Sequence, residues 1–443
     1  MNWQHTMMVA GVALVGVKGV QAAEFDPQGV EAAYFDELPT VVSAGRMEQS
    51  LTRAPASVTV IDREMIEASG RTSLPDLMRL AAGFQVGHQG GFWVGVTRHG
   101  VSEEFARRLQ VLVDGRTVYL PGTAGVDWHD LPVALEEIER IEVTRGPNGA
   151  SYGANAYQGT IHIRTREPGT RPGTTVRVDA GEHAYRRTLV SHDARGEHLD
   201  QRLTWHHQED EGYPGEDEGA RHDQHRHKIN YRGRLRPGVN DYVDVMGGLT
   251  AGEWGSGTEG DRFRPAREAK VERYYGQLAW QRLFSTREEL RARLHVERSD
   301  TALVANLPPL TELGMPDGFR GTRGDSDAPL RLDESRDIRR VEAEVEYHHQ
   351  PVRALRLIWG AQSRRDTMAA AGYFGDGDTR TLEHNRMFGH AEWRLASAWT
   401  PFGVAEHPIV LEGPGVAVTE VACGRHGVAP ALGAPDQTQR ADG

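Results

Sequence analysis

The spacing of apolar residues changes part-way along the chain. Between residues 54 and 166, short apolar runs alternate with stretches of helical spacing, as in a compact domain of mixed helices and strands. The run Ser57–Ile61 predicts a strand, and the run Leu109–Val113 predicts a buried strand. Helical spacing predicts a helix over Ser73–Ala81 and a short amphipathic helix over Leu135–Ile141.

After Pro168 the helical spacing disappears and apolar and polar residues alternate. Leu203 with Trp205, and Leu355 through Ala361, show the pattern. We expect about ten strands, each of roughly ten residues, between Thr174 and Leu395. Long polar connections separate some of them, namely Glu209–Asp223, Trp254–Glu268 and Asn306–Asp337.

Such alternation gives a sheet with one apolar and one polar face, which occurs both in soluble sandwiches and in membrane barrels. The run of similar strands, the 9 Trp and 12 Tyr residues, and the alternation of long with short connections favour a transmembrane β-barrel. Alternation stops after Leu395, so no further strand is expected in residues 396–443. This segment is either a disordered tail or, as the abrupt break favours, the product of a frameshift.

The N-terminus resembles an export signal. The apolar run Met7–Val17 is too short to span a membrane, which needs about 20 residues. It is followed by Val20–Ala23, whose small residues are typical of a cleavage site. We therefore expect residues 1–23 to be a signal peptide cleaved after Ala22 or Ala23; the alternative is a buried N-terminal helix.

Composition narrows the range of functions. The 51 basic and 63 acidic side chains give a net charge of −12, which argues against nucleic-acid binding. The single cysteine, Cys423, excludes a disulfide framework, a Cys-ligated zinc site and an iron–sulfur cluster within the chain. No nucleophile elbow, phosphate-binding loop or HExxH helix occurs, so we predict no enzyme activity, no catalytic residue and no cofactor.

Four stretches resemble the TonB-dependent outer-membrane receptors. Residues 38–44 are similar to a TonB box, and residues 54–61 to the opening strand of the plug domain of that family. Residues 111–116 match its central strand and turn, and residues 138–163 its most characteristic stretch. The order and spacing agree from about residue 37 to 168, although His162 stands where the family usually has Asn.

The resemblance implies the domain organisation. A TonB-box linker (24–48) would precede an α+β plug domain (49–168), followed by an incomplete antiparallel transmembrane β-barrel (169–395) and the aberrant tail (396–443). About ten strands would be present, whereas the barrel of the family needs about 22. The chain would then be a truncated receptor product, a receptor completed by a second chain, or an exported plug-like binding module without transport activity.

The resemblance also implies a function and partners. Receptors of this family carry a scarce solute, such as an iron chelate (a siderophore) or cobalamin, across the bacterial outer membrane. The TonB energy-transducing complex pulls on the plug of such a receptor. Substrate binding on one side and TonB contact on the other are coupled through a segment that passes from ordered to disordered. The expected partners are therefore TonB, a small-molecule substrate and the outer membrane, with no nucleic acid.

Three groups of site residues follow from the resemblance. The TonB-interacting segment would be Leu38, Pro39, Thr40, Val41, Val42, Ser43 and Ala44, an extended strand that adds to the sheet edge of a partner; the alternative is an ordinary linker. Phe92 and Trp93 are candidates for substrate contact, or else pack inside the plug. Arg140 and Arg145 would contact the barrel, or else form surface ion pairs.

Histidines are frequent, with 20 in the chain, so chance clusters are expected. Three groups stand out, at His206–His207, at His222, His225 and His227, and at His348–His349. His225 and His227 would share one strand face, which a metal site requires. Exposed histidines without a metal are the favoured interpretation, and no metal site is predicted.

Overall fold

The computed structural model describes residues 40–42, 45–51, 54, 56–89, 93–98, 108–122, 125–153, 155–212, 219–263, 265–309, 312, 330–374, 379–393 and 402–409. The chain divides into two units, residues 1–39 and 40–443, and every described residue belongs to the second. The predicted signal peptide and most of the predicted tail lie outside the described residues, so both stay predictions.

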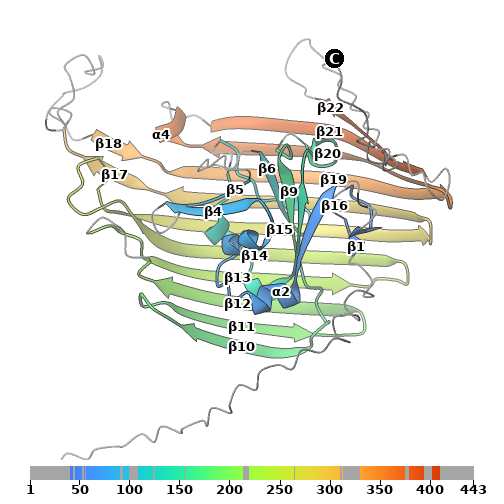
Figure 1. The fold of residues 1–443 in the computed structure, drawn as a ribbon, viewed down its shortest axis with the longest axis horizontal. Helices are drawn as coiled ribbons and strands as arrows, with labels where there is room; N and C mark the ends of the chain where they lie inside the picture. The colour runs from blue at the N-terminus through green and yellow to red at the C-terminus, as the bar shows by residue number, and fades with distance from the viewer. Residues whose placement is uncertain are drawn as a thin grey trace, which may run out of the picture. The chain divides into compact units, whose positions relative to one another are not determined.

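A five-stranded mixed sheet forms the centre of the first domain. Its order is β3-β8-β9-β6-β7, and only β6 and β9 run parallel (Figure 1). The strands are β3 (Ser57–Asp62), β8 (Ile138–Arg145), β9 (Gly159–Thr165), β6 (Leu109–Val113) and β7 (Arg116–Thr117). Two small hairpins flank it, β1 (Thr40–Val41) with β2 (Gln49–Ser50), and β4 (Phe84–Gln89) with β5 (Trp93–Arg98). The strands predicted at residues 57–61 and 109–113 are confirmed.

Short helical segments complete this domain. They are α2 (Arg63–Ala68), η2 (Pro75–Leu80), η3 (Trp128–Asp130), η4 (Leu135–Glu137) and α3 (Gly149–Tyr152). The Asp62 carboxylate caps α2 by accepting a hydrogen bond from the Met65 amide at 2.8 Å. The helix predicted over residues 73–81 is present only as the shorter 3₁₀ helix η2.

The helix predicted over Leu135–Ile141 is wrong. A single 3₁₀ turn ends at Glu137, whose carboxylate accepts a hydrogen bond from the Ala134 amide at 2.9 Å. Strand β8 then begins at Ile138 and pairs with both β3 and β9. Ile138, Ile141 and Val143 are buried in the core, so tertiary packing in the sheet overrides the local helical spacing.

Apolar side chains from these strands and helices form one core. Its members, all buried, include Ile61, Leu77, Val96, Val111, Trp128, Leu131, Ile141 and Ile161. We call the region from β1 to β9 the plug. One face of the sheet packs in this core, whereas the other face of β8 and β9 carries polar residues such as Glu142 and His162.

The second half of the chain forms an eleven-stranded antiparallel sheet, which we call the wall. Its order is β10-β11-β12-β13-β14-β15-β16-β19-β20-β21-β22 (Figure 1). The bounds are β10 Gly173–Ala180, β11 Arg186–Ala194, β12 Leu199–Asp210, β13 Gln224–Leu235, β14 Asp241–Ser256, β15 Arg267–Ser285, β16 Glu288–Ala302, β19 Arg336–Val352, β20 Leu355–Ala369, β21 Thr379–Trp393 and β22 Phe402–Ile409. Ten of these strands lie where alternation predicted about ten.

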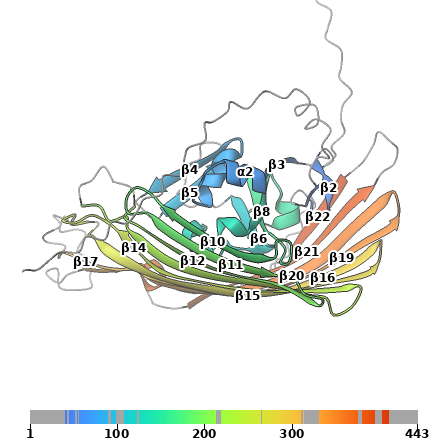
Figure 2. The ribbon, with the colours of Figure 1, turned by 90° about the horizontal axis from the view of Figure 1, so that it is seen from below.

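The wall curves around the plug, which lies on its concave, inner face (Figure 2). Strands β10 and β22 form the two edges and do not pair with each other, so within the described residues the sheet is open. The expected incomplete barrel is therefore confirmed as a plug with a partial wall. Among the residues the structure describes, no helix has the length and apolar character needed to cross a bilayer.

The two faces of the wall differ in chemistry. On β12, Arg202 and Thr204 are buried against the plug, whereas Leu203 and Trp205 point outward and are 53% and 37% exposed. The same alternation recurs on β13, where Asn230 is buried and Ile229 exposed. An outer face rich in exposed apolar side chains is typical of strands that face lipid.

Long and short connections alternate between the strands. Short turns join β11 to β12, β13 to β14, β15 to β16 and β19 to β20, and long connections join β12 to β13, β14 to β15 and β16 to β19. The longest of these contains the hairpin of β17 (Val304–Leu307) and β18 (Leu330–Asp333). A one-turn helix, α4 (Ala371–Phe374), follows β20. The long connections therefore lie at one end of the wall strands, and the short turns lie at the other end.

Strand β22 corrects the prediction that no strand follows Leu395. It pairs with β21 from Glu392↔Phe402 to Asn385↔Ile409. The open edge of β21 supplies backbone donors and acceptors, and pairing with it does not require alternating side chains. The origin of residues 396–443 stays a prediction.

Replacing Ile161 with Ala tests the plug core. Ile161 lies in β9 between β6 and β8 and is fully buried. We expect the free energy of opening of these strands to fall by about 2–5 kcal/mol, because the cavity is left among rigid neighbours. Hydrogen exchange of β6, β8 and β9 peptides measures it. The control Met65→Ala, at a side chain 39% exposed, should change it by under about 1 kcal/mol; equal losses in both variants would contradict the assigned core.

Candidate functional site

The inner face of the wall buries carboxylates of its own, such as Glu342 and Asp366, and also, where it meets the plug, a set of arginines. These arginines occupy alternate, buried strand positions at Arg187, Arg202, Arg226, Arg232, Arg273, Arg336 and Arg340. The plug turns a series of carboxylates toward them from the connection between β7 and β8. That connection contains the 3₁₀ turns η3 and η4; Asp127 precedes η3 and Asp130 ends it, while Glu136 and Glu137 lie in η4.

Four ion pairs join the plug to four different strands. They are Asp127–Arg336 at 2.6 Å (β19), Asp130–Arg226 at 3.1 Å (β13), Glu136–Arg187 at 2.6 Å (β11) and Glu137–Arg202 at 3.5 Å (β12). Glu137 also accepts a hydrogen bond from Asn230 at 3.0 Å. Short turns thus reach strands that are far apart in the wall.

These pairs are buried, which sets their energetic weight. The side chains of Asp130 and Arg226 are 2% and 4% exposed. Burial, together with the charge of Asp127, raises the pKa of Asp130 even though Arg226 lies beside it. Removing one partner of a buried pair costs about 3–5 kcal/mol, whereas an exposed pair contributes about 0–1 kcal/mol. An arginine that lost its carboxylate would therefore be a buried, unpaired charge and would destabilise the plug–wall interface.

The turn between β6 and β7 makes a second contact with the wall. Asp114 and Gly115 have φ angles of 46° and 82°, the left-handed conformation that an Asp-Gly hairpin turn requires. The Asp114 carbonyl accepts a hydrogen bond from Gln277 of β15 at 3.1 Å. Its carboxylate lies 3.7 Å from the guanidinium of Arg232, which also donates to the Thr165 carbonyl at 2.8 Å.

Asp114 is stabilised as an anion, in contrast to Asp130. Burial raises its pKa, but the charge of Arg232 and hydrogen bonds from the amide and hydroxyl of Thr165, both at 2.9 Å, outweigh burial and leave the pKa lowered. A carboxylate with a lowered pKa contributes stability that is fully present above its unfolded pKa and is lost as the pH falls through the folded value. This contact is therefore complete at neutral pH.

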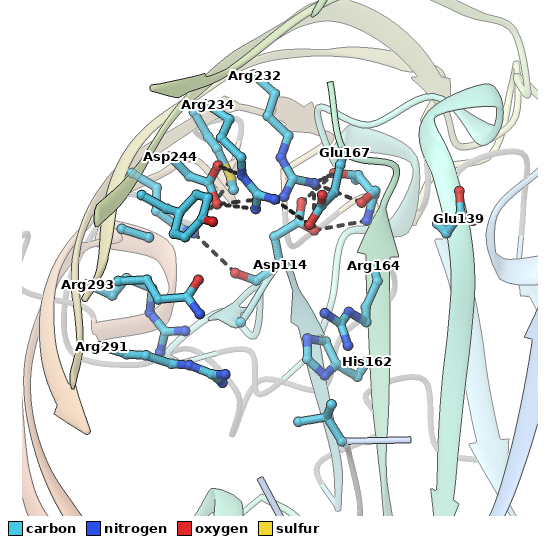
Figure 3. A pocket seen from close by; sticks show the side chains of 18 of the residues that line it. Asp114, Glu139, His162, Arg164, Glu167, Arg232, Arg234, Asp244, Arg291 and Arg293 are labelled. Carbon is cyan, nitrogen blue, oxygen red and sulfur yellow. Dashed lines mark hydrogen bonds and ion pairs between the residues drawn. The ribbon is translucent and has the colours of Figure 1, made fainter. Parts of the chain in front are cut away.

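A polar cavity of about 640 Å³ lies between this turn and the wall (Figure 3). Its lining alternates in charge, and arginines slightly outnumber carboxylates. Arg234 pairs with Asp244 at 2.7 Å and with Glu167 at 2.5 Å, while Arg293 donates to Glu344 at 2.6 Å. Such a lining suits water and charged groups rather than an apolar ligand.

The N-terminal end of the described chain is bound to the plug. Val41 is buried and pairs with Gln49 in the β1–β2 hairpin. The next amide, that of Val42, donates a hydrogen bond at 2.9 Å to the buried carboxylate of Glu142 on β8. Arg46 forms ion pairs with Glu344, at 3.2 Å, and Glu346 of β19.

The predicted TonB-interacting residues fall partly within this arrangement. Thr40, Val41 and Val42 lie on or beside β1, whereas Leu38, Pro39, Ser43 and Ala44 lie outside the described residues. Their contact with TonB stays a prediction. Phe92 and the side chain of Trp93 also lie outside the described residues, so the prediction that they contact substrate is equally untested.

The plug–wall ion pairs described above involve residues other than the predicted Arg140 and Arg145. Arg140 forms its ion pair within the plug, with Glu142 at 2.9 Å. Arg145 ends β8, in register with Ser57 and Gly159. Their contact with the wall stays a prediction.

Sequence reasoning missed the carboxylates of residues 127–137. The signal that was available is the repetition of arginine at alternate positions of the predicted strands. A buried arginine that finds no carboxylate on its own sheet needs one from the domain packed against it. The structure also brings His207 beside His225 and His227, which do share one strand face as the spacing suggested.

Comparison with known proteins agrees with this arrangement. The family described as "TonB-dependent Receptor Plug Domain" matches residues 50–160. The vitamin B12 transporter BtuB of Vibrio cholerae is 32% identical over 193 residues, covering 41% of this chain and 30% of that protein. BtuB of Vibrio vulnificus is 33% identical over 156 residues, covering 34% of this chain and 24% of the relative. The chain thus spans less than a third of the length of these relatives.

Solved structures show the same fold. The ferric yersiniabactin uptake receptor FyuA of Yersinia pestis matches 79% of this chain and 56% of its own length, with a TM-score of 0.61 at 15% identity. The Pseudomonas aeruginosa receptor FpvA, solved with a bound pyoverdine, matches 86% of this chain and 56% of its own, with a TM-score of 0.62 at 13% identity. The sequence match to the plug-domain family covers residues 50–160, and the solved receptor structures share the fold of this plug and of part of the wall.

Proposed function

We propose that this chain serves the TonB-dependent uptake of a scarce solute, of the iron-chelate or cobalamin type, across the bacterial outer membrane. The observation that carries the proposal is the plug domain at residues 50–160, bound through its carboxylates to the polar face of the wall. The relatives support the solute class, since they are named as a vitamin B12 transporter and a ferric yersiniabactin uptake receptor. They are transporters and receptors, which supports a role other than catalysis.

The N-terminal segment suits the role of the TonB contact. Thr40 and Val41 are held by a hairpin with only two paired positions and by the Val42–Glu142 hydrogen bond. A strand from a partner can replace these few contacts. This segment lies on the plug near the end of β19 that leads into a short turn, because Arg46 pairs with Glu344 and Glu346 there. TonB acting at this edge would pull on β1 and then on the plug.

Movement of the plug has to overcome its buried ion pairs. The pairs join strands β11, β12, β13 and β19, so a pull transmitted through the plug loads several pairs in turn rather than all at once. A charged interface also admits water as it opens, which lowers the cost of separating the charges. We infer that residues 1–23 direct export, that they are cleaved, and that the mature chain belongs to the outer membrane.

The open sheet favours a second candidate, an exported plug-like module that binds the solute without transporting it. Incubating expressing cells with labelled cyanocobalamin or labelled ferric chelates separates the two. Transport predicts accumulation inside cells that requires both TonB and the proton gradient. Binding to the membrane fraction alone, unchanged in a strain without TonB, supports the module; the absence of both signals contradicts the solute class.

A proline at residue 40 tests the TonB contact. Thr40 has an exposed side chain and pairs with Ser50. Thr40→Pro removes the backbone donor needed for strand addition, so we expect capture of the purified periplasmic domain of TonB to fall about five- to tenfold, the equivalent of one net hydrogen bond. The matched control Thr40→Ala keeps the amide and should bind within twofold. Equal binding by all three proteins would show that residues 38–44 are an ordinary linker.

A double-mutant cycle on Asp127 and Arg336 tests how the plug is held. Each side chain is nearly buried, at 7% and 3% exposure. We expect Asp127→Ala and Arg336→Ala each to lower the free energy of unfolding in detergent by about 3–5 kcal/mol, and the double variant to lose less than the sum.

The exposed pair of Arg298 and Asp337, 2.9 Å apart on the wall, provides the control for this cycle. The corresponding alanine variants should each cost about 1 kcal/mol or less. Additive losses at Asp127 and Arg336 would mean that the pair does not hold the plug.

A further inference from the structure

Three imidazoles meet on the outer face of the wall, away from the plug. They belong to His207 of β12 and to His225 and His227 of β13, and we call them the histidine cluster. One ring nitrogen from each can be chosen so that all three lie within 4.8 Å of one another. The ring centroids are 4.5 Å apart for His207 and His227, and 5.0 and 4.8 Å apart for the pairs that include His225.

Strand pairing presets this arrangement. His207 and His227 are direct partners across the antiparallel pair, and His225 is the next residue of β13 on the same face, opposite Glu209. Direct partners have Cβ atoms about 4.5–5.5 Å apart, close enough for two rings to reach one ion. The cluster therefore rests on paired strands and not on a loop, which keeps the cost of organising it low.

Side chains alternate between the two faces of a strand, which shows that the histidine cluster lies on the outer face of the wall. Arg226, between the two histidines of β13, points inward to Asp130 of the plug, so His225 and His227 point outward. They continue the outward row that holds Ile229, as His207 continues the row of Leu203 and Trp205. The cluster lies where the apolar rows end and the long connection between β12 and β13 begins. It is separate from the plug–wall interface and its cavity.

Aromatic packing alone does not explain this cluster. A belt of aromatic residues at a membrane boundary would continue along neighbouring strands. The outward partners on the adjoining strands are instead Thr188 on β11, and Ala251 and Glu253 on β14. Trp205 does stack beside His207, with centroids 6.2 Å apart and planes inclined by 10°. The imidazoles are thus concentrated on one strand pair.

A carboxylate completes the set of donors. Glu209 is the strand partner of His225, and its Oε2 lies 3.8 Å from Nε2 of His207. Arg186 of β11 approaches the same carboxylate at 3.4 Å, an exposed contact that a bound cation would displace or share. None of the three histidine side chains is buried, so an ion from solution has access.

Neutral imidazole is a preferred ligand of Zn²⁺, Cu²⁺ and Ni²⁺. A tetrahedral ion with Zn–N bonds of about 2.0–2.1 Å places its nitrogens roughly 3.3 Å apart, so the ring nitrogens need to approach one another by up to about 1.5 Å. We propose that His207, His225 and His227 bind one divalent transition-metal ion, with Glu209 as the fourth ligand or as the group that orients a ring. The ion fastens β12 to β13 at the start of their long connection.

Titration of the whole, chelator-stripped chain in detergent with Zn²⁺ alone tests this proposal. Calorimetry should show one tight equivalent. His227→Ala and His225→Ala should each weaken it at least about 100-fold, and Glu209→Gln about tenfold, the range for a second-shell partner. Because His225 is exposed, its variant remains decisive if another variant fails to fold.

The control variant is His348→Ala/His349→Ala. These two histidines are neighbours in β19 and so point to opposite faces of the wall. The control should leave the tight equivalent unchanged. If His225→Ala or the triple alanine variant binds Zn²⁺ as tightly as the parent, the proposal is wrong.

Copper provides a second readout that calorimetry alone does not give. A Cu²⁺ ion in the cluster lies next to Trp205 and quenches its fluorescence. We expect quenching at one equivalent in the parent and in the His348→Ala/His349→Ala control, and its loss in His225→Ala. In Trp205→Phe the quenching step should vanish while Zn²⁺ affinity stays within about twofold. Quenching that persists in His225→Ala or in Trp205→Phe would place the ion elsewhere and overturn the assignment.

Discussion

The match between buried arginines on the wall and carboxylates on the plug is the constraint on which the rest of the structure depends. An arginine-rich inner face cannot be covered by an apolar core, because each unpaired buried guanidinium would be costly. The plug therefore places Asp127, Asp130, Glu136 and Glu137 in short turns that aim outward from its apolar core. The plug thus combines an apolar core with a charged surface that complements the inner face of the wall.

The same constraint separates rigidity from movement within the plug. Its apolar core packs Ile61, Ile141 and Ile161 among rigid strands, so it moves as a unit. Its surface contacts are electrostatic and strongest when water is excluded. Asp114 and Asp130 show that the contacts are not equivalent, since the pKa of the first is lowered and that of the second raised. The surroundings of Asp114 favour its charged form, whereas the burial of Asp130 disfavours its charged form.

Sequence patterns predicted the features that depend on short-range spacing. Leu109–Val113 is a strand because a continuous apolar run suits a buried position, Ser57–Ile61 is a partly exposed strand at the edge of the same sheet, and alternation revealed ten wall strands. Pattern reasoning failed at Leu135–Ile141, where spacing typical of a helix belongs to a turn and a strand. It also could not pair Asp127 with Arg336 or His207 with His227, because those contacts depend on strand register and on how the plug is seated in the wall. Arg140 and Arg145 were chosen by resemblance, and their contact with the wall stays a prediction.

The unequal connections of the wall have a practical consequence for engineering. Lengthening a flexible connection costs only about 0.6 kcal/mol for each doubling of its length, provided that no paired backbone is disturbed. The connection between β16 and β19 already holds a hairpin of its own, so an inserted epitope or fluorescent tag there extends a connection that is already long. The turn between β19 and β20 has two residues and lies next to Arg356, which donates a hydrogen bond to the Glu48 carbonyl of the plug at 3.0 Å, so the same insertion there would disturb the plug. The two ends of the wall strands thus differ in their tolerance to added sequence.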